Sequence, residues 1–262
     1  MRRLFIFLLL LCQSVCFANH LDVHVAILGD SNTWIGGDSC DNAKGWNKWF
    51  KDKFAPASCV SYARSGATWT NTENTLYNIT EDIAVLGKDN VIYNQINRLI
   101  HAVDEGRQVS PDLIIIAAGT NDAWFQKARP SVFGMTADEA FRDDKDFITA
   151  KNVGEVLTLA ESVRYGCEML MEKFPMTQII LLTPMQSAAV SNEDIHKTGD
   201  IIEGCGRQMG ISVIRQDFNS PVNRVREVKR HLYTSDGTHT NEKGAQRNGY
   251  LIARQISELL NL

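Results

Sequence analysis

Apolar residues along the chain gather into short runs separated by polar, turn-forming segments. The short runs are rich in Ile, Leu and Val, which is typical of strands buried on both faces of a parallel sheet. These predicted strands cover residues 23–28, 59–63, 113–118, 178–183 and 211–215. Longer stretches between them repeat apolar residues with helical spacing. These predicted helices lie near 44–54, 91–105, 154–174, 193–209 and 243–260.

Strands that alternate with helices predict the fold class. A parallel strand needs a long crossover to its neighbour, and a helix in each crossover covers the sheet. The pattern therefore predicts an α/β fold, in which a parallel sheet has helices on both faces. With 262 residues, 44% of them hydrophobic, the chain is long enough for one domain with a substantial core.

The N-terminal segment is distinct from this domain. Arg2 and Arg3 precede an apolar run from Leu4 to Leu11, and Ala18 ends a stretch with small residues at the positions that precede signal cleavage. We expect residues 1–18 to be a secretory signal peptide and residues 19–262 to form a single domain. The predicted location is outside the cytoplasm, either periplasmic or secreted.

A lipid anchor on Cys12 or Cys16 is an alternative to cleavage after Ala18. Leu11 and Val15, which precede these cysteines, are bulkier than lipoprotein cleavage sites normally accept, and this argues against the anchor. No later segment approaches the ~20 apolar residues of a membrane-spanning helix. We therefore expect no transmembrane segment in the mature chain.

Charge and cysteine usage narrow the range of partners. The formal charge of the whole chain is −4, and it becomes −6 once Arg2 and Arg3 are removed with the leader, so nucleic acid is not an expected partner. The cysteines and histidines match no common metal-site spacing, and the sequence predicts neither a metal nor a cofactor.

Four cysteines remain after the leader, and they can pair in three ways. An oxidising compartment permits such disulfides. The pairing local in sequence joins Cys40 to Cys59 and Cys167 to Cys205.

Two polar motifs, one near each end of the mature chain, predict the chemistry. The first predicted strand runs directly into Gly29, Asp30 and Ser31, so that a serine hydroxyl follows a buried strand in a tight turn. Near the other end, Asp236 precedes His239 by three residues. A serine becomes a good nucleophile when a neutral imidazole accepts its proton and a carboxylate orients that imidazole. Ser31, His239 and Asp236 are therefore a candidate catalytic triad.

Ser39 is a rival nucleophile, because Gly37-Asp38-Ser39 repeats the same tripeptide. No apolar strand precedes this copy, and the polar residues after it are typical of a surface turn.

Two further polar positions follow predicted strands. Asn121 comes directly after the apolar run 113–118, and Gly66 follows the run 59–63. In an open α/β sheet, the carboxyl ends of parallel strands meet at one edge and build the site there.

Taken together, the four motifs resemble the signature blocks of the SGNH or GDSL-type hydrolases. The matching residues are Ser31, Gly66, Asn121, and Asp236 with His239, in the order in which the family has them. Asn32 departs from the family pattern, which has leucine there. The resemblance implies a three-layer, flavodoxin-like α/β/α sandwich with a five-stranded parallel sheet. It also implies ester hydrolysis through an acyl-enzyme, with an oxyanion hole formed by the main-chain N–H groups of Ser31 and Gly66 and the side-chain amide of Asn121.

Residues around the motifs bear on the substrate. Trp34, Trp69 and Trp124 lie close to signature blocks, either as stacking surfaces for a sugar or as part of the core. The long excursion 124–152 is a candidate binding loop or lid, and its many charged residues do not resemble a lipase lid. Arg224 belongs to a basic cluster that either faces solvent or contacts a carboxylated sugar; the cluster also contains Arg226, Lys229 and Arg230.

The expected function is that of an exported esterase that removes acetyl groups from a carbohydrate. A lysophospholipase or thioesterase is the alternative enzyme. A glycan-binding protein without catalysis is the alternative from a different class, and a complete triad argues against it.

Overall fold

Five parallel strands form one sheet at the centre of the protein. The computed structural model describes residues 21–142 and 146–262, so the predicted leader over residues 1–18 lies outside the described residues. The sheet has the order β2-β1-β3-β4-β5. Its strands are β1 (Leu21–Gly29), β2 (Pro56–Ser61), β3 (Leu113–Ala117), β4 (Gln178–Leu182) and β5 (Ser212–Ile214).

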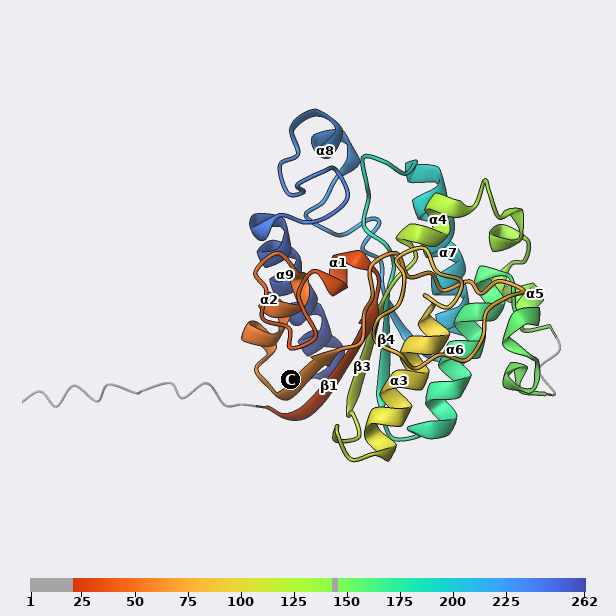
Figure 1. Cartoon of the computed structure of the whole chain (residues 1–262). Coiled ribbons are helices and arrows are strands. Elements are labelled where there is room, and N and C mark those ends of the chain that lie inside the picture. The colour runs from red at the N-terminus through yellow and green to blue at the C-terminus, as the bar shows by residue number, and fades with distance from the viewer. Residues whose placement is uncertain (1–20, 143–145) are drawn as a thin grey trace, which may run out of the picture.

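Helices cover both faces of this sheet, which confirms the predicted three-layer architecture (Figure 1). One face packs against α3 (Ile92–Asp104), α6 (Leu159–Lys173) and α7 (Asn192–Met209). The other face packs against α2 (Trp46–Phe54) and α9 (Glu242–Leu260).

Alternate residues of the central strands supply the two cores. Leu28 and Ile116 belong to the larger core, whereas Ile27 and Ile115 belong to the core under α2 and α9, and all four are fully buried. Side chains of a strand point alternately to its two faces, so a strand buried on both sides must be apolar at every position. This requirement explains the continuous apolar runs in the sequence.

The predicted strands agree with the observed ones in number and order, but β2 begins earlier than expected, at Pro56. Pro56 pairs with Leu21 beyond a shift in register. β2 is an edge strand, and proline is accepted at the start of an edge strand because no ladder hydrogen bond is lost there.

Most of the excursion 124–152 packs on the outer helices. It contains α5 (Ala137–Ala140) and two 3-10 turns, Pro130–Phe133 and Ile148–Ala150. A further 3-10 turn, Val153–Glu155, follows just beyond it. Val132, Ala137 and Ala140 are buried in the larger core beside residues of α6 and α7. Figure 1 shows α5 beside these two helices, far from α1.

Three short helices stand at the edge where the strands end. They are α1 (Ser31–Trp34), α4 (Thr120–Phe125) and α8 (Arg224–Arg230), in the upper half of Figure 1. α1 follows β1 and α4 follows β3, and Gly29 pairs with Ala117 at the ends of these adjacent strands. The two helices therefore begin side by side.

The expectations about membrane-spanning helices and about disulfides can be compared with the described residues. Over residues 21–142 and 146–262, no helix combines the length and apolar character needed to cross a membrane. The four cysteines are free thiols, so neither local disulfide is present. The Sγ atoms of Cys40 and Cys59 nevertheless lie 3.7 Å apart.

Candidate active site

The backbone just before Ser31, at the end of β1, is fixed by a side chain of α3 that forms two hydrogen bonds with Gly29. Gln95 of α3 donates from Nε2 to the Gly29 carbonyl and accepts the Gly29 N–H at Oε1, both at 2.8 Å. Asp30 then caps α1 by accepting the N–H of Asn32 at 3.1 Å. Ser31 is the first residue of α1, so its own N–H has no partner within the helix.

The structure brings together the three predicted triad residues. His239 Nε2 lies 2.9 Å from Ser31 Oγ, and His239 Nδ1 lies 2.6 Å from Asp236 Oδ2. A carboxylate only accepts, so the proton of the neutral ring belongs on Nδ1 and Nε2 is free to accept the serine proton. Ser31 is thus hydrogen-bonded to a base that is itself oriented by an acid.

Asp236 keeps its negative charge although part of its carboxylate is shielded from water. Partial burial raises its pKa, but hydrogen bonds from the His239 ring and from the main-chain N–H groups of His239 and Thr238 outweigh that effect, and the pKa lies below its usual range. The exposed fractions are 36% for the His239 side chain and 53% for that of Asp236, so the triad lies at an open surface.

The loop that carries His239 is fixed from two sides. The N–H of Thr240 donates to Asn32 Oδ1 of α1 at 3.3 Å. The buried carboxylate of Glu227, on α8, accepts the N–H groups of Tyr233 and Thr234. These contacts hold the imidazole over α1.

Ser39, the rival nucleophile, is in a different environment. It is exposed in the turn after α1, and its carbonyl accepts from Lys51 Nζ at 2.8 Å. The described histidine that contacts a candidate nucleophile is His239, and it contacts Ser31.

Asn121 and Gly66 lie together beside α1. Asn121 is near the start of α4, and its Nδ2 donates to the carbonyl of Ala67 at 2.9 Å. The same amide nitrogen carries a second N–H. Gly66 has a φ of +81°, and a Cβ there would lie 2.2 Å from the carbonyl oxygen of Val85, so the position requires glycine.

The chain is similar to known proteins over most of its length. A sequence profile of the GDSL-like lipase/acylhydrolase family matches residues 27–247. The chain belongs to this family. No curated protein sequence matches the chain in a sequence search.

Solved structures described as lipases or acylhydrolases share the fold at low sequence identity. A putative GDSL-like lipase from Bacteroides ovatus is 18% identical with a TM-score of 0.56, and the match covers 91% of this chain and 98% of the other. A possible lipase from Chitinophaga pinensis is 16% identical with a TM-score of 0.55, covering 92% and 99%. The lipase/acylhydrolase from Enterococcus faecalis is 18% identical with a TM-score of 0.51, covering 90% and 97%.

Asp122 supports the site of this GDSL-like protein, although the sequence analysis gave it no role. Its fully buried carboxylate accepts the N–H groups of Trp69 and Thr70 and the Thr70 hydroxyl, at 2.8–3.0 Å. Burial raises its pKa against the effect of these hydrogen bonds. Asp122 and Asn121 thus anchor the segment that follows Gly66. The available signal was an acidic residue next to a site residue at the end of an apolar strand.

Asp30 is a second buried carboxyl that sequence reasoning left without a role. Burial raises its pKa to about 6, while hydrogen bonds from the Asn32 N–H and the Thr120 side chain and the charge of His239 act in the opposite direction. Asp30 therefore couples the ends of β1 and β3 beneath Ser31.

The three tryptophans near the signature blocks differ in exposure, and one of them belongs to the core. Trp69 is 1% exposed and belongs to the larger core. Trp34 and Trp124 are 48% and 49% exposed. Trp34 follows Ser31 by one helical turn and Trp124 follows Asn121 by the same spacing, so both can border a bound substrate.

Proposed function

We propose that this member of the GDSL-like family is an exported esterase that removes acetyl groups from a carbohydrate through an acyl-enzyme. Membership of the GDSL-like lipase/acylhydrolase family supports ester hydrolysis by this protein. The observation that carries the finer mechanism is the position of His239, hydrogen-bonded to both Ser31 and Asp236.

In the proposed first step, Ser31 Oγ attacks the ester carbonyl and its proton moves to His239 Nε2. The imidazolium then gives this proton to the departing alcohol oxygen as the carbon–oxygen bond breaks, which leaves the acyl group on Ser31. Water then attacks the acyl carbonyl carbon while His239 Nε2 takes one of its protons. The imidazolium returns this proton to Ser31 Oγ as the bond between the acyl carbon and Oγ breaks, which releases the carboxylic acid and restores the free serine. Asp236 stabilises the imidazolium in both steps without being protonated itself.

The negative charge that develops on the carbonyl oxygen needs donors. We assign these to the N–H of Ser31, the N–H of Gly66 and the second amide N–H of Asn121. The Asn121 contact with Ala67 supports this assignment because it holds the amide against the segment that contains Gly66. Donors fixed before the reaction stabilise an oxyanion more than water does, since they need no reorganisation.

An open site with exposed aromatic rings supports a carbohydrate substrate. Trp34 and Trp124 each present about half of their surface, and the rings of tryptophan suit the faces of sugars. Export through the predicted leader would place the enzyme where polysaccharides occur.

A longer acyl chain is the second candidate. A cavity of about 190 Å³ adjoins Gly66 and is lined in part by Leu86 and Phe125. Leu86 is 73% exposed, so an apolar chain that covered it would gain burial energy. This observation favours the lysophospholipase or thioesterase alternative.

The test is product release from acetylated xylan, acetylated pectin, acetylated simple sugars and long-chain acyl esters by wild type, Ser31→Ala and Ser39→Ala. We expect acetate from wild type and Ser39→Ala and none from Ser31→Ala. Release from long-chain esters alone would select the second candidate. Full activity of Ser31→Ala on any ester would contradict the mechanism.

A further inference from the structure

A cavity of about 280 Å³ lies between α4 and the segment 189–191. Trp124 and Lys127 line it on the α4 side, and Ser191, Asp194 and Arg224 line it on the other. The triad mechanism uses none of these side chains.

Two contacts join the wall of this cavity to the loop that carries His239. The N–H of Ala188 donates to the Gly237 carbonyl at 2.7 Å, and the hydroxyls of Ser187 and Thr238 are 2.8 Å apart. The opposite wall is α4, which also carries Asn121. One wall of the cavity is therefore connected to the loop that carries the base, and the other wall belongs to the helix that carries the proposed oxyanion donor.

Arg224 is held rigidly at this cavity. Its Nη1 donates to the carbonyls of Ser187, Ala188 and Val190 at 2.5–2.7 Å, and its main-chain N–H donates to Gln186 Oε1 at 3.0 Å. Within residues 21–142 and 146–262, its Nε and Nη2 atoms form no hydrogen bond or ion pair. One edge of the guanidinium is thus fixed and the other remains available for a ligand.

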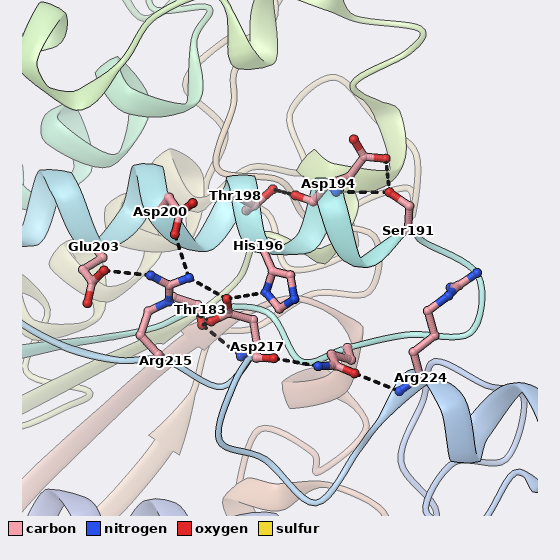
Figure 2. A network of polar contacts seen from close by, with 11 residues as sticks. Thr183, Ser191, Asp194, His196, Thr198, Asp200, Glu203, Arg215, Asp217 and Arg224 are labelled. Atoms are coloured by element: carbon pink, nitrogen blue, oxygen red, sulfur yellow. Dashed lines mark hydrogen bonds and ion pairs between the residues drawn. The ribbon is translucent and has the colours of Figure 1, made fainter.

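Arg215 differs from Arg224 in that acidic side chains of the protein pair with its guanidinium. It forms ion pairs with Asp200, Glu203 and Asp217, all between 2.6 and 2.8 Å. Figure 2 shows this network, with the Arg224 guanidinium extended away from it. Gln186 connects the two regions, because its Nε2 donates to the Asp217 carbonyl at 2.9 Å and its Oε1 accepts the Arg224 N–H at 3.0 Å. The charge of Arg215 is compensated within the protein, whereas no described carboxylate pairs with Arg224 or Lys127.

Asp194 is the acidic group of the cavity, and its oxygens are already occupied. Oδ2 accepts from the Ser191 hydroxyl at 2.7 Å, and Oδ1 accepts from Gln126 Nε2 at 3.2 Å. The two cations therefore outnumber the carboxylate, and the unpaired edge of Arg224 suits a planar anion.

We infer that this cavity binds the carboxylate of an acidic sugar in the substrate. The free edge of the Arg224 guanidinium holds the carboxylate, Lys127 adds a second positive charge, and the half-exposed ring of Trp124 stacks on the sugar. The substrate class is thereby narrowed to esters of uronic-acid-containing carbohydrates. This inference rests on the proposed esterase function.

The test compares two substrates that differ in one carboxylate, acetylated methyl glucuronoside and acetylated methyl glucoside, and repeats the comparison with the galacturonoside and galactoside. The measured quantity is the ratio of kcat/KM for the acidic ester to that for the neutral ester. Arg226→Gln is the matched control, because Arg226 is an exposed cation on the same helix that does not line the cavity.

We expect wild type to prefer the acidic ester by about tenfold or more, the effect of a charged hydrogen-bonded pair. Arg224→Gln brings the ratio close to one and Lys127→Gln lowers it by about two- to fivefold, whereas Arg226→Gln leaves it unchanged. A merely structural role for Arg224 would lower both kcat/KM values together. A wild-type ratio near one, or an equal fall for Arg226→Gln, would overturn the inference.

A binding measurement separates failure of this inference from failure of the proposed function. Calorimetry with Ser31→Ala follows binding of an oligogalacturonate and of a neutral galactan oligosaccharide, with and without Arg224→Gln. Arg224-dependent binding of the acidic sugar, without hydrolysis of any ester by wild type, would refute the esterase and retain the anion site. Ester hydrolysis by wild type with no preference for the acidic ester, and no Arg224-dependent binding, would retain the esterase and refute the anion site.

Discussion

Asp236 and His239 are joined by two hydrogen bonds, one from the ring and one from the main chain of the histidine. His239 Nδ1 donates to Oδ2 at 2.6 Å and the His239 N–H donates to Oδ1 at 2.7 Å. The carboxylate therefore fixes both the loop and the tautomer of the base.

Asp236→Asn should lower kcat by about 10³- to 10⁴-fold on a small soluble ester. An amide N–H in place of Oδ2 would donate to Nδ1 and move the ring proton to Nε2, which then cannot accept the serine proton. Asp41→Asn, at an exposed carboxylate outside the triad, is the control and should remain fully active. A loss of less than tenfold in kcat would mean that Asp236 does not orient the base.

Asn121→Ala should reduce kcat by about 10²- to 10³-fold, with KM nearly constant, because the amide acts on charge that appears only in the transition state. Steady-state kinetics and a thermal melt together test this. A higher KM with an unchanged kcat would assign Asn121 to substrate binding instead.

Gly66→Ala should abolish activity and destabilise the protein, whereas Gly106→Ala should cost only about 1–2 kcal/mol of stability and leave activity intact. Both glycines have positive φ, +81° and +69°, but a Cβ at Gly66 meets the Val85 carbonyl oxygen at 2.2 Å and one at Gly106 meets nothing within 4 Å. Gly106→Ala measures the cost of backbone strain alone, whereas Gly66→Ala adds the steric clash to that strain. Equal melting temperatures and activities for the two variants would contradict the assigned role of Gly66.

Asp30 should make stability fall as pH rises. Its pKa is about 6 in the folded protein against 3.8 as the ordinary value, so its favourable contribution is complete below pH 4 and is lost as pH rises through 6. Between pH 4 and 8, the unfolding free energy of wild type should fall relative to that of Asp30→Asn by about 2 kcal/mol. Urea denaturation of both proteins at pH 4 and pH 8 measures these unfolding free energies. The contributions of all other carboxyl groups cancel when the two proteins are subtracted. Parallel stability curves would exclude an ionising Asp30.

Oxidation should join Cys40 to Cys59, whose Sγ atoms are 3.7 Å apart. The bond would close a loop spanning 19 positions in sequence and stabilise the fold by about 3 kcal/mol. Thiol titration and mass measurement after mild oxidation should show two thiols lost from wild type and from Cys205→Ser, but not from Cys40→Ser. Loss of both thiols in Cys40→Ser would identify a different pair.

The sequence by itself determined the sheet and most of the candidate site. Continuous apolar runs specify strands buried on both faces, and residues such as Ser31, Gly66 and Asn121 follow those runs directly, so topology alone brings them to one edge. The spacing of Asp236 and His239 is also local, and a separation of three residues is short enough for the turn to make the hydrogen bond.

Only the tertiary structure decided which serine meets the histidine, because Ser31 and His239 are 208 positions apart and the same tripeptide precedes Ser39. It also decided that Trp69 is buried while Trp124 is exposed, and that Arg224 keeps a free edge while Arg215 is paired. Burial and charge compensation depend on neighbours brought together by long-range packing. The local sequence pattern predicts whether each segment forms a strand or a helix. The neighbours of each side chain are determined only when the helices pack on the two faces of the sheet.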